Sequence, residues 1–138
     1  MKPLRPYLYN AYYDWIIESE ATPYLLVNAE YLNVDVPQEF VKEGQIILNL
    51  SPHSIAQYCV DNEAISFNAR FQGILRDLYI PFGAVIAIYT QETGEGVIFQ
   101  EEEYYSEANY SARQSSKQAV KVTEKSKPKK NTKLKLVK

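Results

Sequence analysis

The residues best suited to hold a ligand lie in the segment Phe67-Asn68-Ala69-Arg70-Phe71. Side chains alternate between the two faces of a β-strand, so a strand with its aromatic residues toward the core directs Asn68 and Arg70 the other way. An amide and a guanidinium beside a small alanine suit an extended ligand that approaches the backbone closely and takes directed hydrogen bonds. An ordinary solvent-facing surface gives the same pattern, and both interpretations stay open on these residues alone.

Side chains suited to catalysis or to metal binding are sparse. The chain has one histidine, His53, and one cysteine, Cys59, and this pair cannot build a structural zinc site or a disulfide framework. His53 falls in an expected loop, where histidine is usually solvated, and we expect Cys59 to be a small buried hydrophobe. The segment Gly94-Glu95-Gly96 lacks the third glycine and the helix of a dinucleotide site. We therefore expect no enzyme, no cofactor and no bound metal.

The charge of the chain is distributed very unevenly. The 138 residues have a formal net charge of −2. Residues 1–112 hold 5 Lys/Arg and 16 Asp/Glu, giving −11, whereas residues 113–138 hold 10 Lys/Arg and one Glu, giving +9. A basic tail can attract nucleic acid, but the acidic body would repel phosphate and the tail has no aromatic residues among its lysines. Nucleic acid is therefore the weaker expectation for a partner.

The tail divides into two parts. Residues 106–133 contain no Leu, Ile, Phe, Met or Trp, so they cannot bury enough apolar surface to offset their ordering entropy, and we expect a disordered linker. The last five residues return three aliphatic side chains to the chain, interspersed with lysine. This pattern is typical of a short docking peptide, with a frayed terminus as the alternative. The five residues are Leu134, Lys135, Leu136, Val137 and Lys138.

The elements expected to position these residues are one helix followed by strands. Pro6 suits the first turn of a helix, and the run from Tyr7 to Glu20 contains no further proline and no glycine. Its apolar residues occupy nearly two faces, which indicates either a deeply packed core helix or a helix that also meets a second subunit in a two-fold dimer. The residues expected to make that dimer are Leu8, Tyr9, Tyr12, Tyr13 and Ile16.

Beyond Pro23 the apolar pattern shortens to the length of strands. Six short strands after one helix favour a mainly β fold, as a small open barrel or β-sandwich. No run of 18 apolar residues and no secretory leader pattern occurs, so we expect no membrane span and a cytoplasmic location. The expected strands are 24–28, 45–50, 64–71, 75–80, 85–89 and 97–99.

Several of these segments, in order and at matching spacing, resemble the SspB (stringent starvation protein B) family of specificity-enhancing adaptors for the ClpXP protease. The resemblance covers nearly all of residues 3–103 and the last five residues, and its most specific segment is Ile65 to Gly73. This chain has Phe71-Gln72-Gly73 where the family has Phe-Gly-Gly, which we expect to alter one rim of a binding groove. The other matching segments are Arg5–Leu8, Ala11–Trp15, Thr22-Pro23, Val36-Pro37, Glu43-Gly44, Gln45–Pro52, Val85–Tyr89 and Gly94–Phe99.

The resemblance implies a fold, a ligand and a partner. Residues 1–105 would form one domain that consists of the leading helix and a small Sm-like barrel. The helix would make a homodimer, and the barrel would bind the N-terminal part of the ssrA degradation tag of trans-translation products. Residues 106–133 would be a basic linker, and residues 134–138 would dock on the N-terminal zinc-binding domain of ClpX. The implied groove residues are Asn49, Phe67, Asn68, Ala69, Arg70, Phe71 and Gly73, with Ala87 and Tyr89 as further lining.

Two alternatives stay open at this point. One is an Sm-like nucleic-acid-binding protein whose basic tail holds phosphate, which would bind with a steep dependence on salt. The other is a general peptide-binding module that serves a different partner and ignores the ssrA tag.

Overall fold

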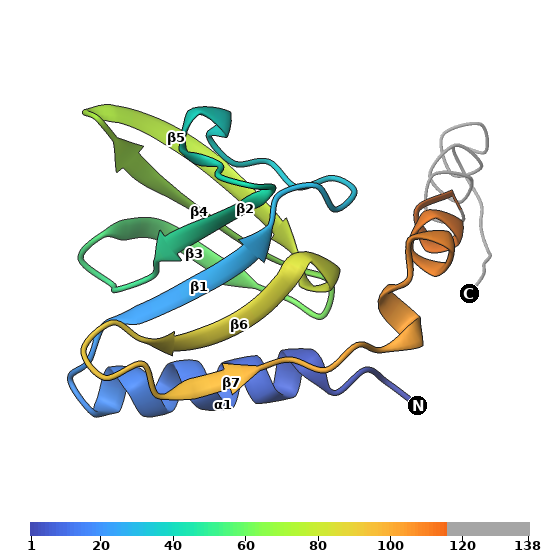
Figure 1. The fold of residues 1–138 in the computed structure, drawn as a ribbon, viewed down its shortest axis with the longest axis horizontal. Helices are drawn as coiled ribbons and strands as arrows, with labels where there is room; N and C mark the ends of the chain where they lie inside the picture. The colour runs from blue at the N-terminus through green and yellow to red at the C-terminus, as the bar shows by residue number, and fades with distance from the viewer. Residues whose placement is uncertain (116–138) are drawn as a thin grey trace, which may run out of the picture. The chain divides into compact units, whose positions relative to one another are not determined.

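One helix and seven strands make up the body of the protein, Met1–Glu102 (Figure 1). The structure is a computed structural model, and it describes residues 1–115. It confirms the expected fold, mainly β with one N-terminal helix. The elements are α1 (Arg5–Glu18), β1 (Pro23–Asn28), β2 (Gln45–Asn49), β3 (Ile55–Val60), β4 (Ala64–Phe71), β5 (Ile74–Pro81), β6 (Val85–Thr90) and β7 (Gly96–Ile98), with short 3-10 turns at Gln38–Phe40 and Phe82–Ala84.

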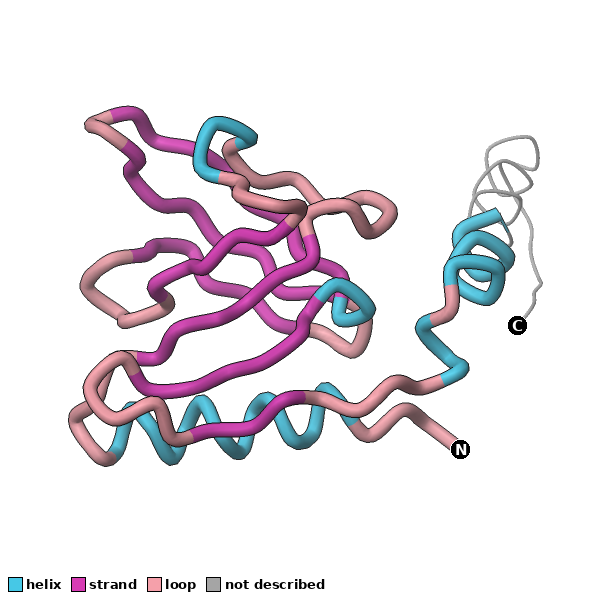
Figure 2. Tube along the Cα trace, in the orientation of Figure 1, coloured by secondary structure: helices cyan, strands magenta, loops and turns pink. Residues whose placement is uncertain are grey.

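The strands form two antiparallel sheets (Figure 2). The first has the strand order β2-β1-β6-β7 and the second has the order β3-β4-β5. All pairings are antiparallel, so the connections between neighbouring strands can be short. The longest ladder joins β4 to β5 and runs from Ala64 opposite Pro81 to Phe71 opposite Ile74.

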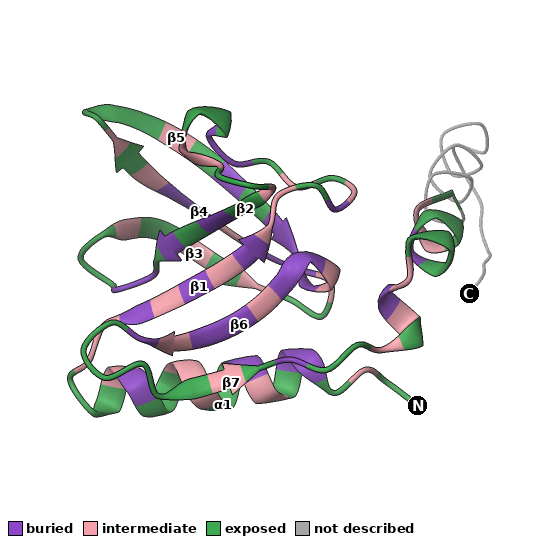
Figure 3. Ribbon diagram, viewed as in Figure 1, coloured by how far each residue is buried: buried purple, intermediate pink, exposed green. Residues whose placement is uncertain are grey.

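The core combines side chains from α1 and from both sheets (Figure 3). Each fully buried Leu, Ile, Val or Phe contributes roughly 1.5–3 kcal/mol relative to the exposed side chain. Pro6 lies in the first turn of α1 as expected, and the helix has no acidic residue in its first turn and no basic residue in its last turn. The fully enclosed residues include Tyr9, Ile16, Leu25, Val27, Ile65, Ile80, Phe82 and Ile88.

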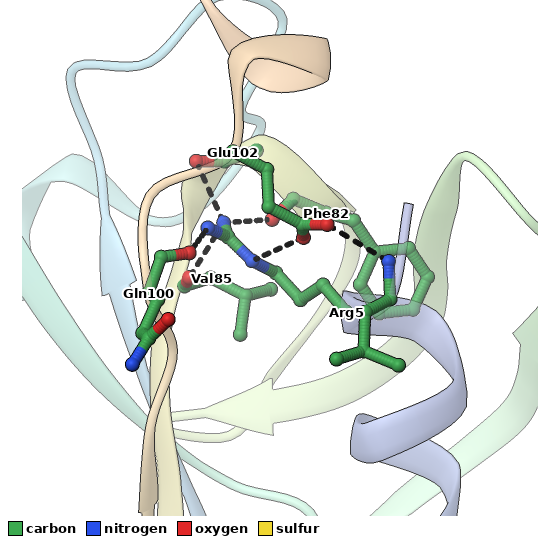
Figure 4. A network of polar contacts seen from close by, with 7 residues as sticks. Arg5, Phe82, Val85, Gln100 and Glu102 are labelled. Carbon is green, nitrogen blue, oxygen red and sulfur yellow. Dashed lines mark hydrogen bonds and ion pairs between the residues drawn. The ribbon is translucent and has the colours of Figure 1, made fainter. Parts of the chain in front are cut away.

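A buried arginine fixes the start of α1 (Figure 4). Arg5 donates hydrogen bonds from Nη1 to the carbonyl oxygens of Phe82 (2.9 Å) and Val85 (3.1 Å), and from Nη2 to that of Gln100 (2.7 Å). Its Nε lies 4.0 Å from Oε1 of Glu102, and Oε2 of Glu102 accepts a hydrogen bond from the backbone N–H of Leu4 (2.8 Å). The helix start is thereby joined to the turn before β6 and to the segment after β7.

Strand β3 is the element that the sequence did not predict. Its side chains show no apolar alternation, because the ladder to β4 shifts register between Ala56 and Cys59. Gln57 has a φ of +54° at this bulge, and one extra residue there re-aims the side chains of the strand. Cys59 is exposed, so the expectation that it is buried was wrong.

Residues 103–115 form a unit of their own within Glu103–Lys138. A 3-10 turn, Glu103–Tyr105, precedes a helical stretch at 107–115. Ser106 caps it by accepting the N–H of Asn109 on its hydroxyl (3.2 Å), and Arg113 lies 3.7 Å over the ring of Tyr104. The expectation of disorder from Ser106 onward is therefore corrected for 106–115. The rest of the predicted linker and the predicted docking residues 134–138 lie outside the described residues.

Candidate functional site

Strand β4 carries most of the predicted ligand-binding residues, and its far end is open on one side. All eight residues of β4 pair with β5, but the pairing with β3 ends at Ala69, opposite Ile55. Arg70 and Phe71 therefore have a β5 partner and no β3 partner. Unpaired backbone N–H and C=O groups at a strand edge are a template on which an extended peptide can add as a further strand.

Asn68 stands immediately before this open edge. The residue is only 8% exposed, although its side chain makes no hydrogen bond to any of the described residues, and its amide atoms are not among the fully enclosed polar atoms. Most buried polar groups have a hydrogen-bond partner, so this amide keeps a free donor and acceptor pair at the surface of the strand. A carboxamide of this kind can pair with the backbone of a bound peptide.

The two faces of β4 follow from its register with β5. Phe67 opposite Leu78, and Ala69 opposite Arg76, share one face, whereas Asn68 opposite Asp77 lies on the other. Phe67 and Asn68 are both buried, so burial does not alternate along the strand as the sequence suggested. Asn68 lies on the opposite face of β4 from Phe67, as expected, but it is nearly as buried as Phe67, so that face is not simply a solvent face.

Arg70 also lies on the Asn68 face, and it is exposed. Its Nη1 donates a hydrogen bond to the carbonyl of Gly73 (3.3 Å) across the two-residue turn that ends β4. Both turn residues have positive φ, +53° at Gln72 and +81° at Gly73, as hairpin turns of this length require. Glycine adopts this backbone freely and glutamine does not, so Gln72 carries a backbone strain that a glycine at that position would relieve.

Three predicted groove residues lie in the other sheet. Asn49, Ala87 and Tyr89 belong to β2 and β6, where Tyr24 of β1 stands between Asn49 and Tyr89 in register. The rings of Tyr24 and Tyr89 are in edge contact at 6.0 Å, and burial, followed by the neighbouring Tyr24, raises the pKa of Tyr89. Among the described residues, no hydrogen bond or ring contact joins this group to β4. The predicted site residues therefore come from both sheets, and Tyr24, which sequence reasoning missed, lies between Asn49 and Tyr89 in the first sheet.

Helix α1 exposes a different set of residues from the predicted dimer surface. Tyr9 and Ile16 are fully buried inside the subunit, so they are removed from that surface: their side chains have no area left to offer a partner. Leu8, Tyr12 and Tyr13 are half-buried. The apolar side chains left in solvent are those of Leu4, Tyr7, Ala11 and Trp15, and an open hollow of about 330 Å³ is lined by Ala11, Tyr12 and Trp15.

A tyrosine cluster joins α1 to β3. The rings of Tyr13 and Tyr58 stack at 5.1 Å, the hydroxyls of Tyr9 and Tyr58 lie 2.6 Å apart, and Tyr13 donates a hydrogen bond to the carbonyl of Leu50 (3.0 Å). Tyr58 lies in the β3 bulge opposite Phe67, so the bulge directs it at the helix. No local sequence pattern predicts this contact, because Tyr9 and Tyr58 are 49 positions apart.

The described residues offer little for other chemistry. Within 1–115, no three His, Cys, Asp or Glu side chains gather in a way that could hold a metal ion. No helix in that range is long and apolar enough to cross a membrane. His53 is exposed.

Comparisons with known proteins agree with one another. The sequence model of the family described as "SspB: Stringent starvation protein B" matches residues 3–138. A protein from Haemophilus influenzae named "Stringent starvation protein B homolog" is 55% identical over 107 residues, which is 78% of this chain and 71% of the relative. The family match spans both the body and the tail.

Proposed function

The chain belongs to the stringent starvation protein B family, and from this premise we propose that it is a protease adaptor. In this proposal the body binds the ssrA tag of trans-translation products, and the tail brings the tagged protein to the ClpX unfoldase of ClpXP. The adaptor carries out no covalent step and acts in the cytoplasm. Its contribution is to raise the local concentration of tagged substrate at the protease.

The observation that carries the proposal is the buried Asn68 carboxamide with no hydrogen bond to the described residues. It stands beside the open edge of Arg70 and Phe71, where pairing with β3 has ended. An extended peptide laid along this end of β4 gains main-chain hydrogen bonds from the edge and from the amide. The Asn68 amide atoms are not fully enclosed, so a bound peptide can take their hydrogen bonds in place of solvent.

Arg70 adds selectivity for charge in this proposal. Its one hydrogen bond to the described residues is a long one to Gly73, at 3.3 Å, so a ligand carboxylate or backbone carbonyl can replace that partner at small cost. Hydrogen bonds from a guanidinium to a carboxylate are stronger than those between neutral groups. We therefore expect the peptide to present an acceptor to Arg70.

The exposed stripe on α1 supports the proposed homodimer. Leu4, Tyr7 and Trp15 are about half exposed, and with Ala11 they recur at spacings of three and four residues, which places them on one side of the helix. A second copy of this helix would bury the stripe in an isologous contact. A dimer then carries two peptide sites and two tails.

The tail supplies the second contact in the proposal. Two weak contacts joined by one chain become a tight assembly, because the second contact is intramolecular. The predicted tether is 106–133; the helical stretch at 107–115 lies in its described part, and the remainder lies outside the described residues.

Degradation kinetics test the delivery step. ClpXP is given an ssrA-tagged substrate at increasing concentration, with and without this protein. An adaptor that concentrates substrate lowers the apparent KM more than it raises kcat. Equal KM values with and without the protein, for a tagged substrate that the protein is shown to bind, would contradict the delivery role.

A further inference from the structure

The long connection between β1 and β2 is attached to the sheet that contains β4. Asp35 and Tyr79 of β5 exchange two backbone hydrogen bonds, N–H of Asp35 to the Tyr79 carbonyl (2.9 Å) and N–H of Tyr79 to the Asp35 carbonyl (3.0 Å). The chain then enters the 3-10 turn Gln38–Phe40, which has no side-chain cap hydrogen bond at its start. The side chains of Glu39 and Phe40 in this turn contact the β4–β5 hairpin, and these contacts hold the turn in place.

Glu39 and Arg76 form the first of those contacts. The guanidinium of Arg76 on β5 donates two hydrogen bonds to the carboxylate of Glu39, from Nη1 to Oε1 (3.4 Å) and from Nη2 to Oε2. The hydrogen bond from Arg76 lowers the pKa of the Glu39 carboxyl, and the same bond raises the pKa of Arg76. Because the pair is exposed to solvent, it adds little to folding stability. Its bidentate hydrogen bonds instead fix the orientation of the Glu39 side chain relative to Arg76.

Phe40 and Phe71 form the second contact. Their ring centroids are 5.3 Å apart with a tilt of 43°, and both residues remain half-exposed. Phe71 stands opposite Ile74 in the β4–β5 ladder, and Ile74 is 58% exposed. Ala69 lies two residues before Phe71 on the same face, opposite Arg76. The four apolar residues therefore make one partly open surface, with the ion pair at its side.

We propose that Glu39 and Arg76 are positioning residues that hold Phe40 against Phe71, and that this aromatic pair, with Ala69 and Ile74, receives an apolar side chain of the bound peptide. The inference rests on the proposed function, and it adds a determinant of specificity from outside β4. The surface adjoins the open edge at Arg70 and Phe71, so successive side chains of a peptide added there point alternately to this face and to the face of Asn68.

Without the ion pair, Phe40 is free to leave Phe71, and binding has to reorder the turn. Ordering one or two side chains on binding costs about three- to tenfold in affinity. The pair itself contributes little to folding because both partners are exposed. Loss of the pair should therefore reduce peptide affinity without a matching loss of thermal stability.

Charge reversal and restoration test the inference. A labelled ssrA-tag peptide is titrated with the full chain and with Glu39→Arg, Arg76→Glu, the double exchange and Phe40→Ala. Each single reversal should weaken binding by about three- to tenfold, the double exchange should restore most of the affinity, and Phe40→Ala should weaken it as much as the singles. Lys42→Glu and Glu43→Arg are matched controls, because they alter net charge equally at exposed positions of the same connection.

A series of tag peptides with single alanine replacements separates a direct side-chain contact from a general effect on the fold. At one apolar position of the peptide, replacement by alanine should lower the affinity for the unaltered chain but should not lower the affinity for Phe40→Ala. Provided that the unaltered chain binds the tag peptide, any of three results would overturn the inference. The first is unchanged affinity in both single charge reversals, and the second is no recovery of affinity in the double exchange. The third is that, at every apolar peptide position, the loss of affinity from alanine simply adds to the loss from Phe40→Ala. If the unaltered chain binds no tag peptide, the proposed function fails and this inference fails with it.

Discussion

The hydroxyl oxygens of Tyr9 and Tyr58 lie 2.6 Å apart and join α1 to β3, the strand beside β4. Tyr9 is fully buried, so Tyr58 is the partner that satisfies its hydroxyl. Burial is the largest cause that raises the pKa of both phenols, and for Tyr9 the neighbouring Tyr58 raises it further. The helix that we propose as the dimer surface is thereby in contact with the bulge opposite the proposed peptide strand.

Replacing Tyr58 with phenylalanine tests this contact through stability. Tyr58→Phe leaves the Tyr9 hydroxyl buried without its partner, so the free energy of unfolding should fall by about 1–2 kcal/mol near neutral pH. Urea unfolding followed by circular dichroism measures this. An unchanged free energy of unfolding in Tyr58→Phe would contradict the importance of the contact.

The same phenols predict a dependence on alkaline pH. Their pKa values are raised in the folded chain, so the stability they contribute is complete below the unfolded tyrosine pKa of about 10 and is lost as pH rises above it. The temperature at the midpoint of unfolding should therefore decrease as the pH rises above about 10, and decrease less steeply in Tyr58→Phe. Parallel slopes for the two proteins would show that other groups cause the loss.

The sequence predicted the fold well, with two informative failures. Alternation in 64–71 and the Gln72-Gly73 turn located the β4–β5 hairpin, because local patterns decide such elements. Strand β3 was missed since its bulge disrupts the alternation. Tyr9 and Ile16 were assigned to a dimer surface because spacing shows which residues share a helix face but not which face meets the rest of the chain.

For the candidate site, the sequence could propose residues but not their arrangement. Asn68 and Arg70 were chosen from residue type and strand alternation, and the structure places them at the end of the β3 pairing. That end cannot be read from local sequence, because it depends on where β3 starts. Phe40 and Arg76 were missed for a related reason: their contacts join segments more than 30 positions apart, and no spacing rule relates such residues.

Arg5 is predicted to be the most important single polar side chain for stability. Arg5→Met removes donors from three buried or partly buried carbonyls, so the free energy of unfolding should fall by about 2–4 kcal/mol. Arg5→Lys should recover only a part, because one ammonium cannot reach the carbonyls that the forked guanidinium reaches. Thermal unfolding followed by circular dichroism measures both variants, and full stability in Arg5→Lys would show that charge alone is sufficient.

The exposed stripe of α1 predicts how the dimer is broken. Trp15→Lys places a charge in the proposed helix contact, so the chain should become monomeric at micromolar concentration while its fold is kept. Size-exclusion chromatography with light scattering measures the mass. Ile47→Lys is the matched control, because Ile47 is exposed to a similar degree, 54% against 46%, but lies on β2. Dissociation by the Ile47 change alone would assign the interface to the sheet.

The last five residues are predicted to act only in delivery. Removing 134–138 should leave tag-peptide affinity unchanged and abolish the reduction in apparent KM of ClpXP for tagged substrate, because the tether loses its second contact. Removal of the segment 129–133 keeps the terminal residues and shortens the chain by the same length, which makes it a control. Normal delivery without 134–138 would show that the docking residues lie elsewhere.

Fluorescence anisotropy of a labelled ssrA-tag peptide, titrated with the full chain at low and high salt, measures binding at the end of β4. We expect saturable binding that changes little with salt, and that weakens at least about tenfold in Asn68→Ala and in Arg70→Glu while circular dichroism shows an intact fold. Absence of binding would show that the chain is not a receptor for this tag, and binding that falls steeply with salt and is unaffected by both substitutions would assign binding to the basic tail.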